Sequence, residues 1–247
     1  MQKLEASVSG TLPRLAALPA DILRFVRRPD LPDKTAGWSK VTALLLLGVI
    51  AIDILLDNLI QSVLRALDGR VINLPEMFES DVTTAQLLLS FLVLAPLVEE
   101  AMFRGWMSGR KASLRFAAWG LAALLLALSG ELVVTQEYLT PITIAAFGLA
   151  GIGFGQWVLT YRRDAEVPGW FQRHFHWLVW ASAIAFGLFH LGNYMGAFSL
   201  GHVLIVSPAI LGGLLLAYTR TRFGLRAAIA HHAIYNAVYL GVTAIGS

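Results

Sequence analysis

Residues 87–106 read LLLSFLVLAPLVEEAMFRGW, an apolar run that ends with two adjacent glutamates and an arginine. A membrane helix needs about 20 mainly apolar residues, and this stretch has that length. Ionisable side chains within such a helix are costly and usually face the interior of a helix bundle. The stretch therefore predicts a membrane-spanning helix that holds Glu99, Glu100 and Arg104 inside the protein.

The composition of the whole chain is that of a membrane protein. Of the 247 residues, 57% are hydrophobic and 14% are charged, whereas soluble domains have about 25% charged residues. Cysteine is absent, which excludes a thiol nucleophile, a cysteine-bound metal and a disulfide. The net charge of +3 is explained by basic loops on the cytoplasmic side of a membrane. We therefore expect membrane lipids as partners and no nucleic acid.

Hydrophobic segments of membrane-spanning length recur along the chain. They predict an all-α, polytopic integral membrane bundle of about seven transmembrane helices, with a polar intramembrane cavity. The predicted spans lie near residues 41–63, 83–104, 116–130, 139–161, 177–197, 202–219 and 225–245.

The distribution of basic residues predicts the orientation of these helices. With the N-terminus inside, 17 of the 19 lysines and arginines fall on the cytoplasmic side, and only Arg65 and Arg70 fall outside. This bias follows the positive-inside rule. We therefore expect a multi-pass protein, in a bacterial cytoplasmic membrane, with its N-terminus in the cytoplasm and its C-terminus outside.

The predicted domains are a cytoplasmic N-terminal segment, residues 1–40, and a single transmembrane domain, residues 41–247. The segment has no apolar run long enough for a cleavable signal peptide. Within it, residues 12–28 combine apolar and basic positions. Two interpretations remain open for that stretch: an amphipathic helix on the membrane surface and a solvated linker.

Two later predicted helices also contain polar residues. Residues 185–193 (AFGLFHLGN) include His190, and residues 227–239 (AAIAHHAIYNAVY) include His232 and Asn236. Such intramembrane groups usually mark a functional site. Three separate helices therefore contribute candidate site residues.

Helical spacing predicts which of these groups cooperate, because residues four apart share one face of a helix. Glu100 and Arg104 are so spaced and can form an ion pair. Glu99 points elsewhere and has no cation at this spacing, so we expect it to act as a general base. The imidazole of His232 and the amide of Asn236 share a face and can converge on one developing charge.

Three motifs in this order resemble those of the CPBP family, which comprises CAAX proteases and bacteriocin-processing enzymes. EEAMFR (residues 99–104) resembles its EExxxR motif, FGLFH (186–190) its FxxxH motif and HAIYN (232–236) its HxxxN motif. The resemblance covers a core of about residues 84–240.

This resemblance implies a glutamate-type intramembrane endopeptidase that acts on a membrane-associated protein or peptide. It leaves open whether the substrate is prenylated. The implied catalytic residues are Glu99 and His190, which activate a water molecule, and His232 and Asn236, which form the oxyanion hole. The implied supporting residues are Glu100, Arg104 and Phe186.

A zinc-dependent version of the same protease is one alternative, since one glutamate and two histidines form a known catalytic zinc set. The chain has no HExxH motif, and the family resemblance favours a mechanism without metal. We therefore expect no cofactor, with zinc as the less favoured possibility.

Two further alternatives are not enzymes. The polar residues could stabilise helix packing in a membrane scaffold, because interhelical hydrogen bonds are common. Asp53 and Asp57, one turn apart in the first predicted span, could instead serve a proton-coupled transporter. No helix-breaking pair in corresponding halves of the chain supports a transporter.

Overall fold

The computed structural model describes residues 15–77, 83–133 and 136–246. Helices make up most of this described part, which forms no β-strand beyond two isolated bridges. The predicted all-α fold is therefore confirmed. The chain divides into two units, Met1–Arg104 with Phe175–Ser247, and Gly105–His174, and each is described by itself below.

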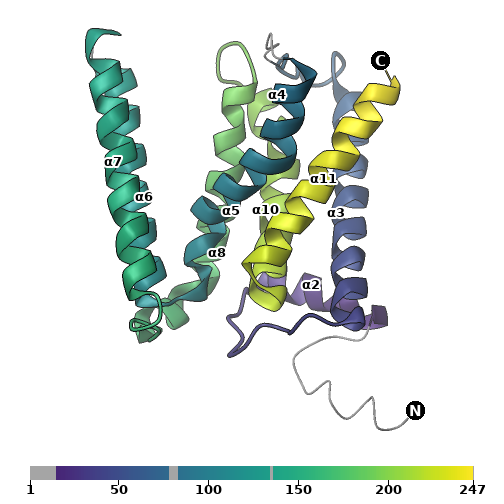
Figure 1. Cartoon of the computed structure of the whole chain (residues 1–247). Helices are drawn as coiled ribbons and strands as arrows, with labels where there is room; N and C mark the ends of the chain where they lie inside the picture. The colour runs from purple at the N-terminus through teal and green to yellow at the C-terminus, as the bar shows by residue number, and fades with distance from the viewer. Residues whose placement is uncertain (1–14, 78–82, 134–135, 247) are drawn as a thin grey trace. The chain divides into compact units, whose positions relative to one another are not determined.

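The first unit is a helix bundle (Figure 1). A π-helical turn, η2 (Ser90–Leu94), joins two of its helices, and a 3₁₀ turn, η4 (His190–Asn193), follows a third. The helices are α2 (Leu18–Arg27), α3 (Lys40–Leu67), α4 (Thr84–Leu89), α5 (Ala95–Arg104), α8 (Gly169–Phe189, from Phe175 on), α9 (Leu200–Ile205), α10 (Ser207–Phe223) and α11 (Leu225–Gly246).

Five segments of the described chain are long and apolar enough to cross a membrane. The two other predicted spans, residues 116–130 and 225–245, are helical, so the count of seven stays a prediction. Many large apolar side chains point outward, among them Leu55 and Leu59 of α3, as expected for contact with lipid. The five segments are Lys40–Leu67, Thr84–Ser108, Thr140–Thr160, Gly169–Asn193 and Leu200–Phe223.

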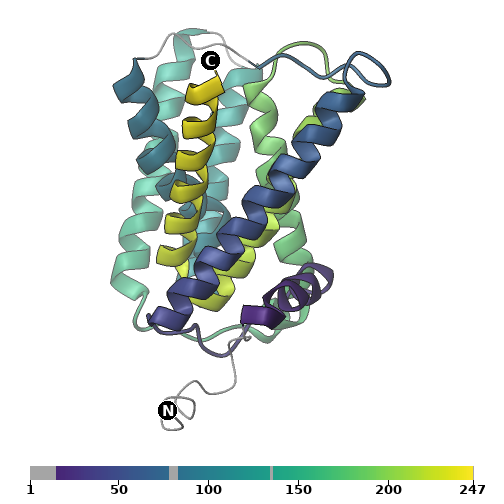
Figure 2. The same ribbon diagram turned by 90° about the vertical axis from the view of Figure 1, so that its right-hand side faces the viewer.

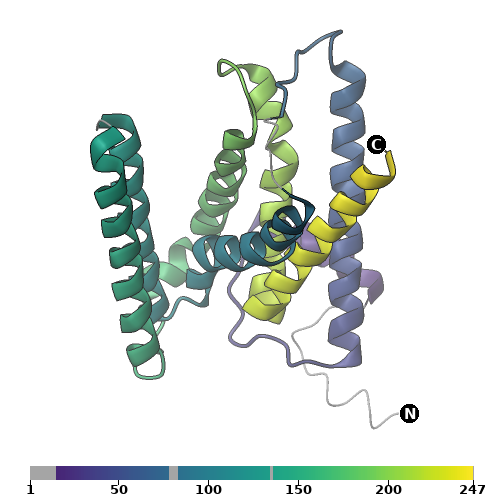
Figure 3. The same ribbon diagram turned by 45° about the horizontal axis from the view of Figure 1, so that its top comes forward.

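The most buried helix of the first unit is α10. Leu214, Ala217 and Tyr218 have no exposed surface, and α2, α3 and α11 all pack against this helix. Gly224, with φ of 94°, ends α10 in a conformation that favours glycine, and α11 begins at the next residue. Figures 1 and 3 show α11 between α5 on one side and α3 on the other.

A close contact between α8 and α10 gives a first testable prediction. A Cβ atom at Gly187 would lie 2.3 Å from Cγ1 of Ile210 and 3.3 Å from its backbone nitrogen. We expect Gly187→Ala to lower the free energy of unfolding by about 1–3 kcal/mol, because overpacking forces the helices apart. Denaturant titration in detergent measures this change.

The matched control is Gly241→Ala in α11, where no heavy atom lies within 4 Å of the added Cβ. This change should leave stability equal or slightly higher, because alanine favours a helix by roughly 0.5–1 kcal/mol over glycine. An equal loss of stability in both variants would contradict the close contact.

The N-terminal stretch forms a helix that packs on the bundle. Leu18, Ile22 and Phe25 of α2 are buried, and α2 packs against α3 and α10. Trp180 Nε1 also donates a hydrogen bond of 3.0 Å to the carbonyl of Val26. Figure 2 shows α2 at one end of the bundle, beside α10. Residues Leu18–Arg27 are therefore helical, with the apolar face of the helix covered by the bundle, and the position of this helix on a membrane surface stays a prediction.

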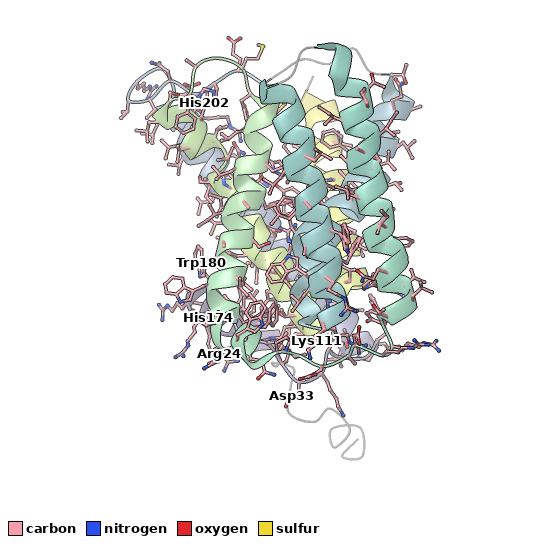
Figure 4. The ribbon with its side chains drawn as sticks, turned by 90° about the vertical axis from the view of Figure 1, so that its left-hand side faces the viewer. Arg24, Asp33, Lys111, His174, Trp180 and His202 are labelled. Carbon is pink, nitrogen blue, oxygen red and sulfur yellow. The ribbon has the colours of Figure 1, made fainter. Side chains whose placement is uncertain are left out.

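Polar contacts hold this end of the bundle as well. Tyr218 donates a 2.8 Å hydrogen bond to Asp21, and Arg222 donates bonds of 2.6 and 3.1 Å to the two carboxylate oxygens of Asp30. Figure 4 labels Arg24 at this end and His202 at the other. Whether the α2 end faces the cytoplasm stays a prediction, and residues 12–14 lie outside the described residues.

The second unit contains two long helices, α6 (Lys111–Val133) and α7 (Gln136–Thr160), which lie side by side (Figure 1). Trp119 Nε1 donates a 2.8 Å hydrogen bond to Gln156. Gly153 allows this approach, since a Cβ there would lie 2.5 Å from Cβ of Trp119. These contacts hold α6 and α7 together around Trp119.

Candidate active site

The end of α5 carries a buried ion pair. Arg104 Nη1 lies 2.8 Å from Glu100 Oε1, and the exposed fractions of the two side chains are 1% and 0%. Arg104 Nη2 also lies 3.4 Å from the carbonyl of Gly213 in α10. The pairing predicted from the four-residue spacing is confirmed. Because both charges are out of water, each needs the other to offset the cost of its burial.

Two side chains from other helices fix the end of α5. The last carbonyls of a helix have no donor within the helix. Ser182 of α8 donates a 2.8 Å hydrogen bond to the carbonyl of Phe103. Arg220 of α10 donates one of 3.0 Å to the carbonyl of Arg104. The glutamates of α5 are therefore held against α8 and α10.

His232 of α11 lies between the two glutamates. Its Nδ1 is 3.0 Å from Glu100 Oε1, and its Nε2 is 3.9 Å from Glu99 Oε2. The latter oxygen is buried and has no hydrogen-bond partner among the described residues. A separation of 3.9 Å is too long for a direct hydrogen bond, but one water molecule bound between the two groups can bridge it.

The ring of Phe186 contacts three other site residues. Its centroid lies 4.0 Å from the guanidinium carbon of Arg104, 4.7 Å from the ring of His190 and 5.9 Å from that of His232. An arginine over an aromatic face is a favourable contact. Phe186 thus connects the motif of α8 with those of α5 and α11.

His190 begins the 3₁₀ turn η4 at the end of α8. Its Nδ1 lies 2.8 Å from the carbonyl of Phe186, and a carbonyl can only accept, so Nδ1 carries the hydrogen. In the neutral ring, Nε2 is then a hydrogen-bond acceptor. The described contacts connect His190 to His232 through Phe186 and do not join it directly to Glu99.

Asn236 reaches the π-helical turn that precedes α5. Its Nδ2 donates a 2.8 Å hydrogen bond to the carbonyl of Phe91. The widened turn explains why this carbonyl is free: the N–H of Ala95 bonds to Ser90, and the next residue, Pro96, has no N–H. Sequence reasoning missed this contact, although a proline within an apolar run was the signal that could have found it.

The fold and the cluster define a class: a multi-pass membrane protein with glutamate and histidine side chains gathered inside a helix bundle. The family model described as "Type II CAAX prenyl endopeptidase Rce1-like" matches residues 81–238, which is more than half of the chain. The chain therefore belongs to the Rce1-like CAAX prenyl endopeptidase family, and the predicted family is confirmed. No curated protein and no solved structure matched the chain.

Family membership establishes the general activity. The protein is a hydrolase of peptide bonds, an intramembrane endopeptidase that acts on a membrane-associated peptide. The scaffold and transporter alternatives are therefore set aside.

Proposed function

We propose that the protein cleaves its substrate with Glu99 as the general base and with His232 and Asn236 as donors to the oxyanion. The observation that carries the proposal is the position of His232, whose two ring nitrogens face Glu100 and Glu99. The following steps describe what each side chain does.

Glu99 binds and deprotonates the attacking water. Its buried Oε2 lacks a hydrogen-bond partner among the described residues, and a buried carboxylate oxygen readily accepts from water. The water oxygen adds to the carbonyl carbon while its proton passes to Glu99. As the C–N bond breaks, Glu99 returns that proton to the leaving nitrogen.

His190 orients the water from the α8 side. Because its Nδ1 hydrogen is donated to the carbonyl of Phe186, the neutral ring offers Nε2 as an acceptor. The water can then donate one hydrogen to Glu99 and the other to His190. This arrangement aims the oxygen lone pair at the substrate carbonyl.

His232 stabilises the oxyanion as an imidazolium. Its Nδ1–H faces Glu100, so donation to the substrate requires a second proton on Nε2. With that proton, the positive charges of His232 and Arg104 balance the two glutamates. During attack, the negative charge moves from Glu99 to the substrate oxygen, and the imidazolium stays paired with an anion throughout.

Asn236 supplies a second donor to the oxyanion. One hydrogen of its amide nitrogen is bonded to the carbonyl of Phe91, which fixes the orientation of the group. The other hydrogen remains available for the substrate oxygen. A donor at such a position is worth about 10²–10³-fold in kcat.

We propose that no metal takes part, which gives the second testable prediction. Within the described residues, no three His, Cys, Asp or Glu side chains form a group that could hold a metal ion. We expect full activity after dialysis against EDTA and 1,10-phenanthroline. The zinc-dependent alternative predicts that activity is lost and then restored by added Zn²⁺.

The function is tested with purified protein in lipid nanodiscs and two matched membrane-anchored peptides, one carrying a farnesylated cysteine and one carrying an acyl anchor. Mass spectrometry identifies the cleaved bond. We expect cleavage by the wild type and none by Glu99→Ala. Cleavage of the farnesylated peptide alone assigns a prenyl specificity, and cleavage of both assigns a general membrane-peptide substrate. Equal cleavage by the variant would overturn the proposal.

A further inference from the structure

Helix α3 lies outside the residues matched by the family model, 81–238, yet two of its carboxylates contact α11. Asp53 Oδ2 lies 3.1 Å from Nε2 of His231. One turn further on, Asp57 shares a side-chain hydrogen bond with Tyr235. The pair that first suggested a transporter is therefore engaged by side chains of a neighbouring helix.

The polar residues of α11 lie in two adjacent rows along the helix. His231 and Tyr235 are four residues apart and form one ridge of the helix, and His232 and Asn236 form the next, about 100° away. The first ridge contacts α3, and the second contacts Glu100 of α5 and the carbonyl of Phe91 in η2. Two adjacent polar ridges therefore fix the rotation of α11 from two sides.

The contact between Asp53 of α3 and His231 of α11 is buried, which favours one rotational position of α11. The exposed fractions of Asp53 and His231 are 4% and 0%. Nδ1 of His231 lies 3.0 Å from the hydroxyl of Thr219, which is also fully buried. A buried carboxylate or imidazole that loses its partner carries a large desolvation cost. If α11 were turned differently about its axis, these contacts would be lost, so that orientation is disfavoured.

We infer that Asp53 and Asp57 are positioning residues that hold His232 and Asn236 at the catalytic site through the neighbouring ridge. The inference rests on the proposed function of those two residues. Without the carboxylates, α11 can rotate, and the 3.9 Å separation between His232 and Glu99 is no longer fixed. The chemical step depends on that separation.

Kinetics of Asp53→Ala and Asp57→Ala test the inference. We expect each to lower kcat by about tenfold to a hundredfold, the effect of a misplacement near 1 Å, with KM nearly unchanged. Asp53→Asn and Asp57→Asn should retain most of the activity, because the amide has the size of the carboxylate and its oxygen can still face His231 or Tyr235. The control is Asn58→Ala, whose side chain bonds within α3 to the carbonyl of Ile54.

A distance measurement makes the test independent of catalysis. The chain has no cysteine, so spin labels at Val93→Cys in η2 and Val242→Cys in α11 report only the separation of these two segments. Both positions are exposed. We expect one narrow distance distribution in the wild type and in Asn58→Ala, and a shifted or broadened one in the two alanine variants.

The outcomes separate the inference from the proposed function. Unchanged distances in both alanine variants, or unchanged kcat, overturn the positioning role. Changed distances support it even if Glu99→Ala proves active, a result that would overturn only the proposed function. If Asp53→Ala does not fold, the half-buried Asp57 supplies the same test with less loss of stability.

Discussion

Glu99→Gln is expected to lower kcat by about 10²–10⁴-fold, the contribution of a positioned general base. The amide keeps the size of the carboxylate but cannot accept a proton from water. The fold should be unaffected, because Glu99 makes no contact shorter than 3.9 Å with a charged partner in the described structure. Cleavage of a membrane-anchored peptide, followed by mass spectrometry, measures the loss.

The matched control is Glu166→Gln. Glu166 is 71% exposed and pairs with Lys111 within the second unit, and an exposed ion pair contributes little. This variant should cleave at the wild-type rate. Equal rates for Glu99→Gln and the control would exclude Glu99 as the base.

Arg104→Met is expected to destabilise the protein by about 3–5 kcal/mol, the cost of leaving one partner of a buried ion pair uncompensated. Glu100 has no exposed surface, and Arg104 is its ion-pair partner within α5. Methionine fills a similar volume, so lost packing contributes less than the unpaired charge. The shift in the denaturant midpoint, with unchanged slope, measures the effect.

The double variant Glu100→Gln/Arg104→Met separates charge from packing. It removes both charges, and replacing a whole buried pair by neutral groups is often nearly neutral for stability. We expect it to recover most of the lost stability while its activity stays low, because His232 loses its anionic partner. If the double variant is no more stable than Arg104→Met, the stability of α5 does not depend on the ion pair.

The sequence predicted those features of the site that depend on local spacing. Glu100 and Arg104 are four residues apart in one helix, so their pairing follows from helix geometry alone. Phe186 and His190 have the same spacing, and their rings are in contact. The long apolar runs likewise predicted a helical membrane bundle.

Contacts between helices could not be predicted in this way, because spacing within one helix does not determine which neighbour it faces. Asp53 and His231 are far apart in the sequence, and only the packing of α3 against α11 brings them together. The docking of α2 similarly depends on Tyr218 and Trp180 in other helices. The bond from Asn236 to Phe91 requires both helix packing and a π-helical turn.

Gly224 has a mechanical consequence for the enzyme. Since only this residue joins α10 to α11, no loop lies between the helix that carries His232 and the most buried helix of the first unit. A displacement of α11 relative to α10 disturbs the contacts between these two packed helices. Catalytic geometry and global stability are thus coupled on this side of the bundle.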